Sequence, residues 1–137
     1  MTTIYILGHG HSITEMMNSP LIKKQYVRKT QGATLVYVDR DSTVSPDLCF
    51  DVCQTWPSDS ASVDTVIDTV GPDNYIFFSN PTFLSELKRV LKSGGEYIGY
   101  AKAETFVQNI KSLEKIFTSV STFQNVPSGF IGIKIIN

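Results

Sequence analysis

The chain has 137 residues, a formal net charge of −1, an apolar fraction of 42% and a charged fraction of 18%. A chain of this size and composition folds around one core, so we expect a single domain over residues 1–137 and exclude a disordered protein. The lack of a basic excess argues against a dedicated binder of nucleic acid or of anionic membranes.

The first third of the chain predicts a strand, a glycine turn and a helix in two pieces. Residues 4–7 form a short apolar run that stops at Gly8-His9-Gly10-His11, where a buried strand would enter a turn. Residues 12–15, Ser-Ile-Thr-Glu, have the form of a capping box and predict a helix start. Pro20 suits the first position of a second helical piece, which we expect Gly32 to close.

Three strands are predicted in the middle of the chain. Residues 34–38 form a β-branched and aromatic run that ends at Asp39, and residues 47–52 form a weaker one. Residues 63–68 predict a fourth strand. The apolar residues of this segment also fit a helical spacing, so periodicity leaves the segment undecided.

The last part predicts a helix, a strand, a second helix and a hairpin. Asn80 and Pro81 supply an N-cap and a first-turn proline for a helix that Gly94 is expected to end. The buried stripe of this helix would be Leu84, Leu87, Val90 and Leu91. Residues 97–101 form the fifth strand, and apolar positions between 106 and 113 mark the last helix. Two extended runs, 117–123 and 130–136, flank a turn and predict a hairpin.

Cys49 and Cys53 are most simply buried small apolar residues in a reducing compartment. A zinc site with His9 and His11 is the alternative, but the spacing matches no standard zinc motif, and we expect no metal. The N-terminus has no secretory leader, and no apolar run reaches the length of a membrane span. We therefore expect a cytoplasmic protein that has no membrane segment.

Two segments resemble a known family. Trp56-Pro57 and residues 62–68, Ser-Val-Asp-Thr-Val-Ile-Asp, are similar to the "WPF…SFDVVID" of S-adenosylmethionine-dependent methyltransferases of the seven-stranded, Rossmann-like class. The spacing from Ser62 to Gly95 also agrees with that family. Alternating strands and helices predict a mostly parallel sheet with helices on both faces. The resemblance implies the strand order 3-2-1-4-5-7-6 with strand 7 antiparallel.

The resemblance implies that S-adenosylmethionine binds beyond the carboxyl ends of the strands, where open sheets bind ligands. Gly8 and Gly10, with His9 between them, match the first two glycines of the family's G-x-G-x-G loop, which lets the backbone approach the cofactor. Asp39 stands where an acid accepts from the ribose hydroxyls, and we place the adjacent Arg40 with it at the cofactor.

The adenine and methionine ends of the cofactor are placed in the same way. Asp51 matches an acid that accepts from the adenine amino group, and Val52 matches the residue that packs on the ring. Asp68 and Thr69 would lie beneath the methionine portion and face the acceptor. Trp56 is expected to be either a core aromatic or a lid over the adenine end. The implied activity is in-line methyl transfer to an unidentified acceptor, in which proximity and orientation supply most of the acceleration.

Ile6 departs from the family pattern. Its members usually carry an acid at this position, two residues before the first glycine, where it holds the cofactor's ammonium; an unpaired charge in a partly dry pocket is costly. The family's helices before the first strand, which roof the active site, are also missing here. A catalytically silent, methyltransferase-like binding or regulatory subunit is therefore the alternative function. A protein partner or a homodimer would supply the missing lid.

Two weaker resemblances compete locally. Asn80-Pro81-Thr82-Phe83 is similar to the Asn-Pro-Pro-Phe/Tyr signature of methyltransferases that act on exocyclic amines, and in that register residues 60–70 form a helix and 75–79 a strand. Residues 4–12 look superficially like the start of histidine phosphatases, but Gly8 replaces their phosphate-binding arginine. No catalytic residue can be assigned; Asp68, Tyr75 and His11 are the candidate bases.

Overall fold

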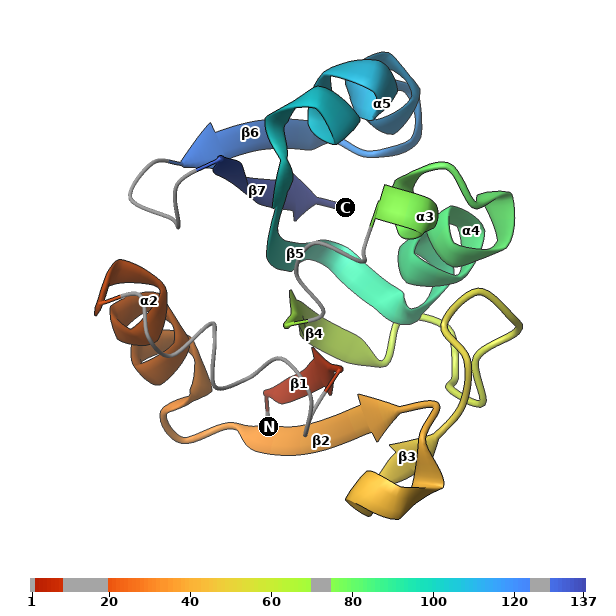
Figure 1. Cartoon of the computed structure of the whole chain (residues 1–137). Helices are drawn as coiled ribbons and strands as arrows, with labels where there is room; N and C mark the ends of the chain where they lie inside the picture. Colours follow the sequence, from red (N-terminus) through yellow and green to blue (C-terminus); the bar gives the residue numbers. More distant parts are fainter. Residues whose placement is uncertain (1, 9–19, 70–74, 124–128) are drawn as a thin grey trace.

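A single seven-stranded sheet forms the centre of the molecule (Figure 1). The structure is a computed structural model and describes residues 2–8, 20–69, 75–123 and 129–137. The strands lie in the order β3-β2-β1-β4-β5-β7-β6. Pairing is parallel from β3 to β5, whereas β7 is antiparallel to both β5 and β6. The strands are β1 (Thr3–Leu7), β2 (Thr34–Asp39), β3 (Leu48–Cys49), β4 (Val63–Asp68), β5 (Leu91–Lys102), β6 (Ser119–Phe123) and β7 (Phe130–Ile136).

Helices cover both faces of the sheet, as the sequence predicted. They are α2 (Pro20–Thr30), α3 (Tyr75–Phe78), α4 (Pro81–Val90) and α5 (Ala103–Ile116), with a short 3-10 helix, η1 (Ser42–Val44). Figure 1 shows α2 on one side of the sheet and α3 and α4 on the other. Among the described parts of the chain, no helix is both long and apolar enough to cross a membrane.

The side chains of β1 alternate between two apolar clusters, because successive residues of a strand point to opposite faces. Tyr5 and Leu7 belong to the larger cluster, which α4 and α5 cover. Ile4 and Ile6 belong to a smaller cluster that Tyr26 of α2 packs against. Ile6 is fully buried there. The apolar residue at this position therefore stabilises the contact between the sheet and α2.

The start of α4 follows from its sequence. The Asn80 side chain accepts a hydrogen bond from the Phe83 amide at 2.9 Å, and Pro81 occupies the first turn, where its missing N–H costs nothing. This cap, together with the strand at Val63–Asp68 and the helix at Tyr75–Phe78, shows that the register implied by the exocyclic-amine signature is wrong. Tertiary pairing with β1 decides that 63–68 is a strand.

The junction between α4 and β5 differs from the prediction. The helix ends at Val90 rather than at Gly94, and β5 already begins at Leu91. Leu91 pairs with Val63, but Glu96 pairs with Thr65, so β5 bulges out between these two pairs. Gly94 has a φ of 79°, and a Cβ on Gly95 would lie 3.0 Å from the Asp64 carbonyl oxygen. The two glycines therefore make a bulge inside a strand.

Other predictions are corrected or lie outside the described residues. The third strand spans two residues rather than six, because the chain turns sharply after Phe50. Cys49 is exposed rather than buried, and Cys53 is half-buried at the edge of the larger cluster; both are free thiols. The expected helix start at 12–15 and most of the hairpin turn lie outside the described residues.

Candidate functional site

Three parallel strands end side by side at one edge of the sheet. Leu7 of β1 pairs with Val38 of β2 and with Asp68 of β4, so the residues that follow these strands are neighbours. The Gly8 amide donates to the Val38 carbonyl at 2.9 Å, and the Thr69 amide donates to the Leu7 carbonyl at 3.0 Å. Strand order reverses at β1, and open sheets bind ligands beyond the carboxyl ends of the strands at such a point.

Gly8 makes the turn at this edge possible. Its φ is 79°, a left-handed conformation that costs a residue with a Cβ roughly 1–2 kcal/mol. The backbone turns away from β1 while the Gly8 amide is still held by β2. The prediction of a glycine turn is confirmed at this position. His9, Gly10 and His11 lie outside the described residues.

Asp39 ends β2 beside this turn, and its carboxylate is only half satisfied. The side chain is 8% exposed. Oδ1 accepts from the Asp41 amide at 2.9 Å, whereas the buried Oδ2 has no hydrogen-bond partner among the described residues. A buried acceptor without a donor costs about 1–3 kcal/mol, and more when it is charged. Oδ2 is therefore suited to accept a hydrogen bond from a ligand.

The turn after β3 lies next to Asp39. The Phe50 amide donates to the Asp39 carbonyl at 3.2 Å, which places Asp51 beyond the same edge. Asp51 Oδ1 accepts from the Cys53 amide at 2.9 Å, and the Asp51 carbonyl accepts from the Gln54 amide at 3.0 Å. Burial, and then the Asp51 charge, raises the pKa of the Cys53 thiol, which keeps that thiol protonated.

Val52 and Arg40 occupy opposite environments at this edge. Val52 is 9% exposed and belongs to the larger apolar cluster, so only a small part of its side chain is open to a ligand. Arg40 is exposed, and its carbonyl accepts from the Cys49 thiol at 3.5 Å. The structure therefore places Val52 at the inner border of the candidate site and Arg40 at its outer rim.

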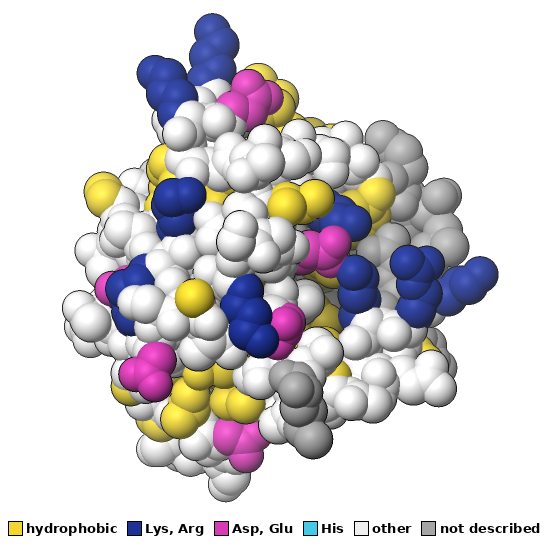
Figure 2. All heavy atoms as spheres, turned by 180° about the vertical axis from the view of Figure 1, so that it is seen from behind, with side chains coloured by type: hydrophobic (Ala, Val, Ile, Leu, Met, Phe, Trp, Pro, Cys, Tyr) yellow, Lys and Arg dark blue, Asp and Glu magenta, His cyan; other side chains and the backbone are white. Residues whose placement is uncertain are grey.

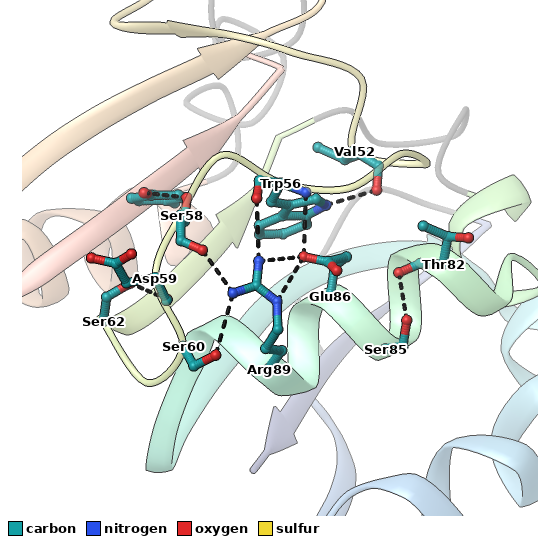
Figure 3. Close-up of polar contacts among 11 residues, drawn as sticks. Val52, Trp56, Ser58, Asp59, Ser60, Ser62, Thr82, Ser85, Glu86 and Arg89 are labelled. Carbon is teal, nitrogen blue, oxygen red and sulfur yellow. Dashed lines mark hydrogen bonds and ion pairs between the residues drawn. The ribbon is translucent and has the colours of Figure 1, made fainter.

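Trp56 is a core aromatic rather than a lid. It is 2% exposed and packs against Tyr5, Phe50 and Phe83, with ring centroids 5.6–6.5 Å apart. Its indole N–H donates to the Val52 carbonyl at 2.8 Å (Figure 3). A buried indole normally has such a partner. Here the partner belongs to the turn that carries Asp51.

Asp68 and Thr69 are fully buried beneath the edge. The Thr69 hydroxyl donates to the Leu7 carbonyl at 2.6 Å. The Asp68 carboxylate accepts a hydrogen bond from the Tyr97 hydroxyl. Asp68 is the one candidate base whose side chain the structure describes; His11 and the Tyr75 side chain lie outside the described set.

Sequence reasoning missed Tyr97. The sequence feature that could have pointed to Tyr97 is Gly99. Both residues lie on the same face of β5, and Gly99 lies beside Asp68 on the neighbouring strand β4. A Cβ on Gly99 would lie 2.9 Å from the Tyr97 hydroxyl oxygen and 3.2 Å from the Asp68 Cβ. The missing side chain of Gly99 therefore leaves room for the hydroxyl to reach the carboxylate.

Several charged groups away from this edge form ion pairs with one another. Burial raises the pKa of Glu96, but hydrogen bonds from Lys29 and Lys134 outweigh it and leave that pKa lowered. Figure 2 shows basic side chains spread over the back of the molecule, with acidic ones close to several of them. Among the residues that the structure describes, no three His, Cys, Asp or Glu side chains gather as a metal site would require.

Comparison with known proteins gives structural relatives only. No family model and no curated protein sequence matches the chain. A SAM-dependent methyltransferase from Aquifex aeolicus is similar, with a TM-score of 0.62 and 14% identity over 98% of this chain and 81% of that one. A predicted O-methyltransferase from Agrobacterium tumefaciens has a TM-score of 0.67 and 13% identity over 98% and 73% of the two chains.

A third relative is a putative methyltransferase solved in complex with the Haloferax volcanii Trm112 methyltransferase activator. It has a TM-score of 0.58 and 15% identity over 98% of this chain and 82% of that one. The strand order and the antiparallel seventh strand are those predicted from the resemblance. The chain therefore has the seven-stranded, Rossmann-like fold of the class I S-adenosylmethionine-dependent methyltransferases.

Proposed function

We propose that this chain binds S-adenosylmethionine at the carboxyl edge of β1, β2 and β4 and transfers its methyl group to an acceptor. The observation that carries the proposal is the buried Asp39 Oδ2, which lacks a donor among the described residues and lies beside the Gly8 turn. Its position at the reversal of strand order is where this fold binds ligands. Similarity to SAM-dependent methyltransferases over 98% of the chain supports the same reading.

The residues present suit an adenosyl group. A ribose hydroxyl would donate to Asp39 Oδ2, since Oδ1 is already taken by the Asp41 amide. The adenine amino group would donate to Asp51, with Val52 against the ring and Arg40 at the rim. Gly8, His9 and Gly10 would let the backbone approach the cofactor. Asp68 and Thr69 would form the floor beneath its methionine end.

When bound, the cofactor supplies an electrophilic methyl group. The chain's contribution is to hold and orient that group against the acceptor and to exclude water, so the reaction needs no covalent enzyme intermediate. Ile6 lies in the cluster on the α2 side and provides no charge for the cofactor's ammonium. Another group in the site therefore has to pair with the ammonium charge.

Cofactor binding is tested by calorimetry with S-adenosylmethionine and S-adenosylhomocysteine. We expect saturable binding that Asp39→Asn weakens by about 10- to 100-fold, because a hydrogen bond to a charged acceptor contributes roughly 1.5–3 kcal/mol. Asp47→Asn is the matched control and should leave binding unchanged. Asp47 lies between β2 and β3 like the residues after Asp39, but its exposed carboxylate already accepts from the Tyr37 amide. No binding by wild type at millimolar ligand would contradict the proposal and favour the silent binding subunit.

Transfer is tested separately from binding. Wild-type protein with methyl-labelled S-adenosylmethionine should transfer label to a component of fractionated cell extract, and Asp39→Asn should transfer less at the same subsaturating cofactor concentration. Binding without transfer to any fraction would again favour the silent subunit. A protein partner is part of this proposal, because one structurally similar methyltransferase was solved in complex with a methyltransferase activator. The free thiols of Cys49 and Cys53 agree with a cytoplasmic location.

A further inference from the structure

The turn that carries Asp51 is held in one conformation by its own hydrogen bonds. The Asp51 carboxylate accepts from the Cys53 amide, and the Asp51 carbonyl accepts from the Gln54 amide. Such a turn orients the carboxylate but does not fix where the turn lies relative to the sheet. A contact from outside the turn has to do that.

The Phe50 amide provides one such contact by donating to the Asp39 carbonyl at 3.2 Å, and Trp56 provides another. Its indole N–H donates to the Val52 carbonyl at 2.8 Å, and both groups are buried. Three aromatic neighbours hold the indole ring, so the donor has little freedom to move. The position of the turn therefore depends on the position of Trp56 as well as on the Phe50 hydrogen bond to β2.

The backbone of Trp56 is in turn held by α4. Its amide donates to Glu86 Oε2 at 3.2 Å, and its carbonyl accepts from Arg89 Nη2 at 3.2 Å. Arg89 Nη1 also donates to the Ser58 carbonyl at 2.7 Å. Figure 3 shows Glu86 and Arg89 pointing from α4 toward this loop, with Glu86 bound to both Arg89 Nε and Nη2. The hydrogen bond from Arg89 lowers the pKa of Glu86, so the pair stays charged near neutral pH.

A continuous series of contacts thus runs from α4 to the adenine end of the candidate site. We propose that Trp56, Glu86 and Arg89 are positioning residues that make the site selective for a 6-aminopurine over a 6-oxopurine. This inference rests on the proposed function, in which Asp51 accepts from the adenine amino group. A 6-oxo group would direct an acceptor oxygen at that carboxylate, and a turn held in place cannot move to relieve the repulsion.

The test compares two ligands, S-adenosylhomocysteine and its 6-oxo analogue S-inosylhomocysteine, by calorimetry. Wild type should prefer the adenosyl ligand by about tenfold or more, which is the size of one charge-assisted hydrogen bond. Trp56→Phe keeps an aromatic ring at this position but removes the indole N–H that binds Val52, and we expect it to reduce this preference to about threefold or less. A general loss of stability would weaken both ligands equally and leave the ratio unchanged.

Arg89→Lys is the second variant, and it provides the same test if Trp56→Phe does not fold. It keeps the charge but lacks the planar fork that reaches two carbonyls, so it should lower the preference in the same direction. Asp64→Asn is the control, because that carboxylate binds the Thr3 amide and Lys92 at the opposite end of β4. Its ratio should equal that of wild type.

The outcomes separate the two proposals. A wild-type protein that does not bind S-adenosylhomocysteine overturns both the proposed function and this inference. A wild-type protein that discriminates between the ligands, with the same ratio in Trp56→Phe and Arg89→Lys, overturns the inference alone. A wild type that binds both ligands equally also overturns it, while the adenosyl site itself would stand.

Discussion

At the scale of single residues, the buried polar groups differ in whether they have hydrogen-bond partners. Asp68 is fully buried and is bound by the Tyr97 hydroxyl, and Thr69 beside it is bound to Leu7. Asp39 is buried with Oδ2 lacking a donor among the described residues. Because buried polar groups are normally hydrogen-bonded, the satisfied pair fits a structural floor, and the unsatisfied oxygen supports the proposed contact between Asp39 and a ligand.

Tyr97→Phe tests the first of these readings. The change leaves the buried Asp68 carboxylate without this donor, so we expect a loss of about 1–3 kcal/mol in the free energy of unfolding. Urea denaturation followed by circular dichroism measures it. Tyr5→Phe is the control, since it removes a hydroxyl that contacts Ser58 Oγ at 2.7 Å in a partly buried place, and it should cost less. An equal loss of unfolding free energy in both variants would show that the hydrogen bond from Tyr97 to Asp68 contributes no more than the partly buried Tyr5 hydroxyl.

At the scale of elements, α4 connects the sheet to the candidate adenine end. Its buried side chains pack on the larger cluster, while Glu86 and Arg89 reach the loop after β3. The helix begins at an N-cap that satisfies an amide its own ladder cannot. Its N-terminus is therefore fixed by a local signal and its orientation by packing.

Asn80→Ala tests the contribution of the cap. Loss of the side-chain acceptor should lower the free energy of unfolding by about 1 kcal/mol, the usual value for such caps. Thermal unfolding with a calorimeter measures the change. Ser85→Ala, at an exposed position of the same helix, should change stability by less than about 0.5 kcal/mol. A cap variant as stable as wild type would show that packing alone starts the helix.

At the scale of the whole molecule, Glu96 joins separate parts of the fold. On β5 it binds Lys29 of α2 at 2.6 Å and Lys134 of β7 at 3.2 Å. These contacts hold its pKa below the ordinary value of 4.5. A carboxylate whose pKa is lower in the folded state stabilises the fold above its unfolded pKa, and this contribution is lost as pH falls through the folded pKa.

Glu96→Gln should therefore destabilise the protein at pH 7 and have little effect once the pH is well below 4.5. Denaturant unfolding of wild type and variant from pH 7 to pH 3 measures the difference. The two stability curves should converge as the pH falls. A difference that stays constant over this range would mean that the lysine contacts do not depend on the charge of Glu96.

The sequence by itself determined the order and type of most elements, the strand order through its resemblance, and the Gly8 turn. The element types and the turn depend on alternation, caps and glycine conformations, which act between near neighbours in the chain, whereas the strand order came from the family resemblance alone. The register of β4, the bulge at Gly94 and Gly95, and the exposure of Cys49 were decided by pairing between strands. The local sequence pattern could not predict these three features, because it contains no information on which strands pair.

Only the tertiary structure decided the surroundings and contacts of the polar groups. It brings Tyr97 to Asp68, which lies 29 positions away, and Arg89 to the Trp56 carbonyl, 33 positions away. It also leaves Asp39 Oδ2 buried without a partner among the described residues. Such contacts depend on how separate elements pack, and no local sequence pattern carries that information because the energies involved are gained only when the sheet and helices meet.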